Sequence, residues 1–247
     1  SIVCKDGNGS GSVVAQSSDS GPLDVDVNED DDIICTITNT VQQSTLTLVK
    51  NLPNDNGGTA TQDDFNVYID GQPAQWGDNI VFPGQHVVSE DTLPGYTPSV
   101  WNDDCDADGN VTVAPGGSAT CDITNDDDAP SLTVVKEVIN DNGGNAVVSD
   151  FNIELNDGNP ALTFDGGSTN GDTTTYTATP TVVANTLYTL TEGDVDGYTE
   201  GSWSCEDDDT QQPVSHPVTL DEGQSVTCTI TNDDDAPSLT VVKEVIN

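Results

Sequence analysis

An internal repeat constrains this chain more than any other feature. The segment ITNDDDAPSLTVVKEVIN occurs at residues 123–140 and again at 230–247. A second pair, LTLVKNLPNDNGGTATQDDF at 46–65 and LTVVKEVINDNGGNAVVSDF at 132–151, aligns without a gap. Self-similarity of this kind is the signature of tandem structural units, so it decides the architecture before any single motif does.

The repeats divide the chain into units that run from a lysine-bearing segment to an ITN segment. We predict two complete units: the first unit, residues 41–128, and the second unit, residues 129–235, which has longer loops. Residues 1–40 are expected to be the C-terminal part of a further unit, and residues 236–247 the first strand of another. The chain is interpreted as a window of a longer array. A polymer completed by strand donation ranks lower, because one strand cannot replace the missing middle strands of residues 1–40.

Composition favours β-structure and excludes several partners. The chain has 4 Lys+Arg against 44 Asp+Glu, a net charge of −40, and only 33% hydrophobic residues. Short Val, Ile and Leu runs between Gly-, Asn- and Asp-rich loops are typical of all-β modules, so we predict tandem all-β modules with long polar loops. Such a negative surface repels nucleic acid and anionic membranes. No apolar run approaches the ~18 residues of a membrane span.

Three of the four lysines occupy one repeat position, at Lys50, Lys136 and Lys243. Alternate residues of a β-strand share a face, and each of these lysines lies two residues after a leucine or valine. In the second unit the row reads Leu132, Val134, Lys136 and Val138. We therefore predict that the lysine points into the core of its unit.

The ITN segment carries a polar residue in the same way. Asn125 follows a cysteine and an isoleucine at two-residue spacing, and Asn232 repeats this pattern. An amide is therefore also expected to point inward near a strand end. A glutamate, Glu90 or Glu192, lies before the GY dipeptide of each complete unit.

These motifs together resemble a known family. YTLTEGDVDGY at 188–198, with the lysine-bearing first strand and the asparagine-bearing last strand, resembles the SpaA/CnaB-like repeat domains of bacterial surface proteins and pilins. The resemblance covers both complete units and extends into the partial ones. It implies Ig-like or prealbumin-like β-sandwich domains in an extended array.

In many domains of that family the lysine amine bonds covalently to the asparagine side chain with help from the glutamate. The resemblance implies the triads Lys50–Glu90–Asn125 and Lys136–Glu192–Asn232, and it assigns Asn39 and Lys243 to triads whose other members lie outside this window. Burial favours the neutral, nucleophilic amine, and a protonated carboxyl can polarise the amide. The first unit departs from the family pattern, because HVVSE replaces YTLTE. The alternative is a buried Lys–Glu ion pair hydrogen-bonded to the asparagine.

The six cysteines fall two per unit, between the segment after the GY–W motif and the ITN segment. An even count and same-unit pairing predict disulfides in an oxidising compartment. Zinc is the rival ligand, but the chain has no C-x-x-C and only two histidines. The predicted pairs are Cys4–Cys35, Cys105–Cys121 and Cys205–Cys228.

Acidic clusters mark the junctions between units. The candidate metal ligands are Asp126, Asp127, Asp128, Asp233, Asp234 and Asp235. The NDNGG segments at 54–58 and 140–144 could return to the same end of the unit. The sequence leaves open whether calcium bridges these joints or the linker is simply solvated; no other cofactor is expected. Asn8 and Asn110 match the glycosylation pattern, which is common by chance.

The features together predict a structural protein of the extracellular space or cell surface. We expect a stalk or filament of tandem repeats, crosslinked by disulfides and isopeptide bonds, whose partners are neighbouring copies or further repeats of the same chain. The alternative is an adhesin that binds surface glycans or matrix through variable loops such as residues 163–180. Catalytic turnover is not expected, since the chain has no Ser–His–Asp spacing, P-loop, HExxH or Rossmann fingerprint.

Overall fold

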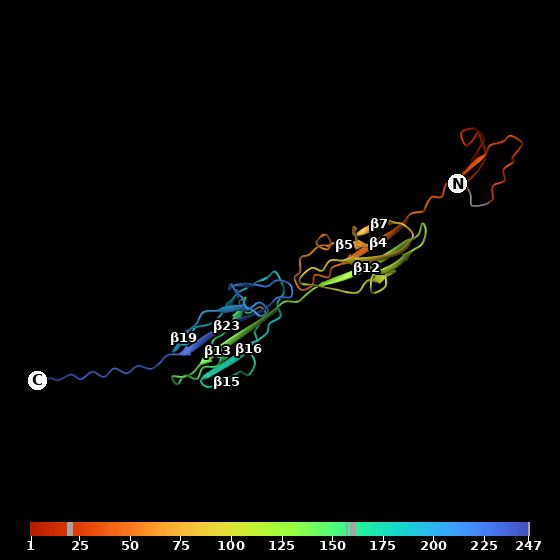
Figure 1. Cartoon of the computed structure of the whole chain (residues 1–247). Helices are drawn as coiled ribbons and strands as arrows, with labels where there is room; N and C mark the ends of the chain where they lie inside the picture. The colour runs from red at the N-terminus through yellow and green to blue at the C-terminus, as the bar shows by residue number, and fades with distance from the viewer. Residues whose placement is uncertain (19–21, 157, 159–161, 247) are drawn as a thin grey trace.

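A computed structural model describes residues 1–18, 22–156, 158 and 162–246. It confirms the predicted all-β fold, with the single-turn 3₁₀ helices η1 (Gln62–Asp64) and η2 (Val148–Asp150) among the described residues. None of the helices in this described part is long and apolar enough to cross a membrane. In Figure 1 the N-terminal piece and the two complete units follow one another along a line, and the C-terminal residues extend away.

The first unit is a sandwich of two sheets. One sheet has the order β10 (Asn102–Asp103), β12 (Ser118–Asp127), β4 (Ser44–Asn51) and β7 (Gly77–Val81), with β9 (Tyr96–Pro98) also paired to β12. The other has the order β11 (Asn110–Val113), β8 (Gly84–Glu90), β5 (Val67–Ile69) and β6 (Gln72–Pro73). Alternate residues of both sheets meet in one core, which contains Leu46, Leu48, Val88, Val111 and Ile123.

The second unit repeats this plan with a larger principal sheet. Its order is β15 (Ser168–Asn170), β16 (Thr173–Ala178), β13 (Ser131–Ile139), β23 (Ser225–Asp234), β20 (Ser204–Asp207) and β21 (Pro213–Val214), and β19 (Tyr198–Glu200) also pairs with β23. The opposite layer consists of the pairs β14 (Glu154–Leu155) with β18 (Leu190–Thr191) and β17 (Leu187–Tyr188) with β22 (Val218–Thr219). Much of segment 163–180 is therefore a hairpin joined to the sheet through β16, which leaves less free loop than the adhesin alternative supposes.

The flanking segments are incomplete by comparison. Residues 1–40 contain a three-stranded sheet, with β1 (Ile2–Lys5) between β2 (Val13–Ser17) and β3 (Ile34–Ile37). Residues 236–246, expected as a first strand, form no strand, and Leu239 and Val241 are 89% and 83% exposed; Asn247 lies outside the described residues. The identical residues 129–139 include β13, because β16 and β23 lie on either side of it. Strand formation in this segment therefore depends on its partners.

The first and last strands of each complete unit run side by side and parallel. In the first unit β4 pairs with β12 and Lys50 lies opposite Ile123. In the second unit β13 pairs with β23 and Lys136 lies opposite Ile230. Because parallel strands end at the same edge, each unit begins at one of its ends and finishes at the other.

The six cysteines form three disulfides, Cys4–Cys35, Cys105–Cys121 and Cys205–Cys228, the same pairs that the sequence predicts. Their Cα atoms are 3.9, 5.2 and 4.0 Å apart. The two short separations belong to cysteines that are direct antiparallel partners in their sheets. In the complete units each disulfide joins the last strand to the strand or turn beside it.

We predict that replacing Cys105 and Cys121 together by serine lowers the free energy of unfolding of the first unit by about 3 kcal/mol, because the bond closes a 16-residue interval of the unfolded chain. Urea denaturation followed by tryptophan fluorescence measures the change. The double serine variant of Cys4 and Cys35, in a separate sheet, is the control and should leave this transition in place. An unchanged midpoint in the first variant would contradict the prediction.

Candidate functional site

A lysine, a glutamate and an asparagine meet in the core of the second unit. Lys136, from β13, and Asn232, from the adjacent β23, are 0% and 2% exposed. The Lys136 Nζ donates a hydrogen bond to Asn232 Oδ1 and lies 3.1 Å from Glu192 Oε2. The side chains are in noncovalent contact, and the strand parity read from the sequence accounts for their inward direction.

The surroundings of Lys136 disfavour its charge. Burial lowers the pKa of the amine, and the nearby carboxylate of Glu192 only partly offsets this effect. The Phe151 ring centroid lies 4.2 Å from Nζ, so the remaining contact on that side is with an aromatic face. The site therefore shifts the lysine toward its neutral form while keeping it beside an amide.

In the first unit the corresponding lysine and glutamate are in contact, while the asparagine is buried without a hydrogen-bond partner. Lys50 Nζ lies 2.5 Å from Glu90 Oε2, although the segment around Glu90 departs from the family pattern. Burial lowers the pKa of Lys50 as it does that of Lys136. Asn125 is fully buried, and neither polar atom of its side chain has a hydrogen-bond partner. An unpaired buried amide costs about 1–3 kcal/mol, so this residue needs a partner that the amine beside Glu90 could supply.

The two remaining candidates, Asn39 and Lys243, lie outside both complete units. Both side chains are exposed, on segments without regular structure. No hydrogen bond or ion pair joins either side chain to a glutamate in the part of the chain that is described. The structure therefore brings together the Lys136–Glu192–Asn232 triad and the Lys50–Glu90 pair, and it leaves Asn39 and Lys243 apart from them.

Sequence reasoning missed the aromatic residue beneath each lysine. The Phe65 ring centroid lies 3.7 Å from Lys50 Nζ. In the second unit the Phe151 ring lies against Lys136 Nζ in the same way. Each phenylalanine also packs edge-on against the tyrosine of the GY motif, Tyr96 or Tyr198. The signal was available, because the interval from lysine to phenylalanine is the same in both units.

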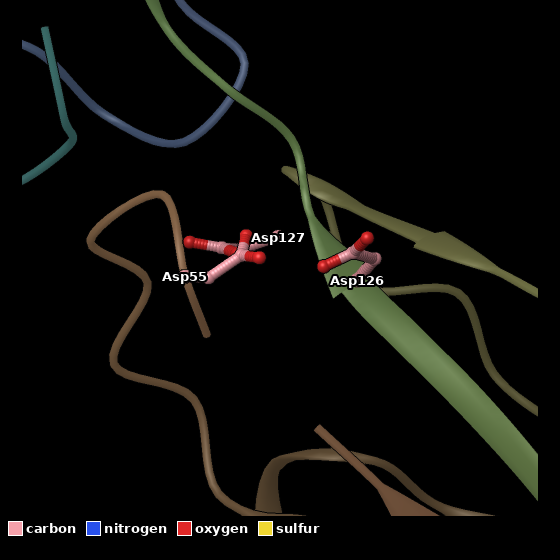
Figure 2. A group of neighbouring side chains, drawn as sticks. All are labelled: Asp55, Asp126 and Asp127. Carbon is pink, nitrogen blue, oxygen red and sulfur yellow. The ribbon is translucent and has the colours of Figure 1, made fainter. Parts of the chain in front are cut away.

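The acidic junctions differ in detail from the predicted sets. Among the residues that the structure describes, two groups have carboxylate oxygens within 4.8 Å of one another: Asp55, Asp126 and Asp127, and Asp141, Asp233 and Asp234. Figure 2 shows Asp127 beside Asp55 of the 54–58 loop, with Asp126 at the end of β12. Asp128 and Asp235 lie outside the groups and accept hydrogen bonds from Thr97 and Thr199 instead.

The buried member of each acidic group already has partners. Asp127 accepts the backbone N–H groups of Asn56 and Gly58, and Asp234 accepts those of Asn142 and Gly144. Burial raises the pKa of Asp234, but these amide hydrogen bonds together bring it below its usual value. The exposed Asp141 has a raised pKa, from desolvation and from repulsion by Asp233 and Asp234.

Of the two glycosylation candidates, Asn8 lies in a turn and Asn110 is the first residue of β11, directly after a turn. Asn8 has a left-handed backbone conformation and its N–H donates to Asp32 O. The Asn110 side chain donates to both carboxylate oxygens of Asp106, an arrangement that belongs to a turn. Both residues are exposed, and neither contact decides whether a glycan is attached.

Comparison with known proteins gives a match over both units. Residues 42–123 and 127–230 match the SpaA-type family described as a prealbumin-like fold domain. The matched ranges contain β4 and most of β12 in the first unit, and β13 and most of β23 in the second. No protein with curated annotation matches the chain.

Solved structures that match the chain include major pilins of Streptococcus pyogenes. The T-13 major pilin of serotype GAS131465 is 14% identical, with a TM-score of 0.35 over 81% of this chain and 98% of that chain. Another major pilin structure from the same organism is 16% identical, with a TM-score of 0.39 over 79% of this chain and 99% of that chain.

Calcium at the acidic groups remains a prediction. We expect millimolar calcium to raise the thermal unfolding temperature, because a divalent cation would offset the repulsion around Asp141, and a chelator should reverse the effect. Differential scanning calorimetry with magnesium as the ionic-strength control measures it. The variant carrying both Asp55→Asn and Asp141→Asn should lose the response. Equal unfolding temperatures with and without calcium would leave a solvated acidic joint.

Proposed function

The chain belongs to the family of SpaA-type domains with a prealbumin-like fold, and on this basis we propose that it is a structural component of an extracellular stalk or filament. The observation that carries the proposal is the parallel pairing of first and last strands in both units. A pull on the two ends of a unit then acts directly on one strand pair. The elongated succession of units in Figure 1 fits a load-bearing array.

The finer part of the proposal is an isopeptide bond in each unit. The neutral Lys136 amine would attack Cγ of Asn232, forming the Nζ–Cγ bond, while the Cγ–Nδ2 bond breaks and ammonia leaves. Glu192 would transfer the proton from Nζ to the departing nitrogen. Each site reacts once and does not turn over, so no enzymatic activity is proposed. The same step would join Lys50 to Asn125 with Glu90.

The disulfides support the proposed location. Three disulfides and no free cysteine among the described residues suit an oxidising compartment. We assign the protein to the extracellular space or the cell surface. Its expected partners are further repeats or copies of itself, and glycan or matrix binding stays an alternative prediction.

We predict that the intact chain is lighter than its sequence mass by ~17 Da for each isopeptide bond and ~2 Da for each disulfide. Lys136→Ala should remove one ~17 Da deficit and lower resistance to heat and protease, because both the tie and the core packing are lost. Glu192→Gln keeps the size of the side chain and should leave the second-unit bond unformed. Intact mass spectrometry before and after reduction measures both.

The matched control is Lys243→Ala, which removes a lysine at the same repeat position but one that is exposed and makes no ion pair with a glutamate among the described residues. Its mass should change only by the substitution. A wild-type mass that shows the disulfide deficit alone would reduce the triads to buried ion pairs, and the stalk would then depend on disulfides and packing.

A further inference from the structure

The two complete units are joined by hydrogen bonds as well as by the linker. The 54–58 loop of the first unit presents Asn56 O to the backbone N–H of Ala184, at 2.7 Å, and Gly57 O to the Asn185 side chain, at 3.1 Å. On the other side of the linker, Gly223 N donates to Asp128 O at 2.8 Å. The second unit is therefore held at several separate points by the end of the first.

The loop that makes this contact is fixed within its own unit. Asp127, 2% exposed, accepts the N–H groups of Asn56 and Gly58 at 2.9 and 2.6 Å. Tyr96 of the GY motif accepts the Ala60 N–H at 3.0 Å. The shape of the loop thus comes from contacts among the NDNGG, GY and NDDD motifs of its own unit. It does not depend on the neighbouring unit.

The far end of the second unit has the same loop in the same shape. Asp234 accepts the N–H groups of Asn142 and Gly144, and Tyr198 accepts the Ala146 N–H at 2.9 Å. The first residue of the outgoing linker makes the same hydrogen bond in both units. In the first unit Asp128 N donates to Gly95 O, and in the second unit Asp235 N donates to Gly197 O. Each unit therefore ends in its own preformed surface, and the two surfaces have the same construction.

Glycines show which of the two surfaces is in contact. A Cβ on Gly57 would lie 2.5 Å from Ala184 O, and one on Gly95 would lie 2.6 Å from Glu222 Cβ. The equivalent glycines of the second unit, Gly143 and Gly197, have open space within 4 Å. The close approach that requires glycine at the first joint is absent at the second surface, although the glycines are present there.

We propose that residues 141–144, Gly197 and Asp235 form a docking surface for a following repeat unit of the same chain. Its Asn142 and Gly143 carbonyl groups would accept the amides that correspond to those of Ala184 and Asn185. The inference deepens the proposed function, since it rests on the array, but it does not depend on the isopeptide bonds.

The sequence also indicates the type of that unit. Residues 236–247 are identical to residues 129–140, the linker and first strand of the second unit, whereas the corresponding residues 43–54 of the first unit differ. The outgoing linker begins with the same backbone hydrogen bond in both units, from Asp128 to Gly95 and from Asp235 to Gly197. The occupant is therefore a unit of the second type, with counterparts of Ala184, Asn185 and Gly223.

The first experiment uses the chain as it is and compares Gly57→Ala with Gly143→Ala. Both glycines have nearly the same φ, +94° and +97°, so the backbone strain of the two substitutions is matched and only the first meets a neighbour. Site-resolved amide exchange at Ala184 and Gly223 should speed up roughly tenfold in Gly57→Ala, the effect of one hydrogen bond, and stay unchanged in Gly143→Ala. Equal exchange rates of these amides in both variants would contradict the hydrogen-bonded joint between the two units.

The second experiment extends the chain after Asn247 with a copy of residues 141–235. The appended counterparts of Ala184 and Gly223 should exchange as slowly as the originals, and Gly143→Ala, silent in the shorter chain, should now speed them roughly tenfold. Fast exchange in a folded appended unit, or failure of that unit to form its disulfide, would overturn the docking surface. Intact mass reports the isopeptide bonds of the same samples, so the two proposals fail separately.

Discussion

Parallel pairing of the first and last strands is the constraint on which the rest of the structure depends. Because β13 and β23 run in the same direction over nine paired positions, the chain begins each unit at one end and leaves it at the other. The same pairing places the lysine row beside the asparagine row. It also brings the loop after the first strand to the end where the last strand finishes, which is where the joint forms.

The polar residues in that strand pair are not explained by packing. Hydrophobic side chains of similar volume would be neutral or stabilising in place of a buried ion pair, and the unpaired Asn125 adds a cost of about 1–3 kcal/mol. A covalent amide between lysine and asparagine removes the amine charge and uses the amide carbon. It would also tie the two strands that a pull on the ends of the unit would load. The arrangement therefore fits bond formation better than it fits a permanent ion pair.

Much of this could be predicted from the sequence because strand parity is local. The inward direction of Lys136 and Asn232 follows from alternation, and the same rule extended by two residues would have placed Asp127 and Asp234 inward as well. The joint could not be predicted in this way. Its contacts on the second unit, Ala184 and Asn185, lie in a loop that has no matching sequence in the first unit, so the repeat gives no signal for them.

Direct contacts, and not charge repulsion, must set how the units are oriented. The net charge of −40 suggests that repulsion could straighten the array, but at physiological ionic strength it is screened over about 8 Å. A unit built on strands of nine and ten residues, such as β13 and β23, is about 30 Å long at ~3.3 Å per residue. Repulsion between the bodies of neighbouring units is then weak, and it matters only where carboxylates meet at the joint. At the joint, backbone amides hold the buried aspartate within its own unit, and carbonyl groups of that unit accept hydrogen bonds from the next unit. These hydrogen bonds fix an orientation that charge repulsion alone would not define.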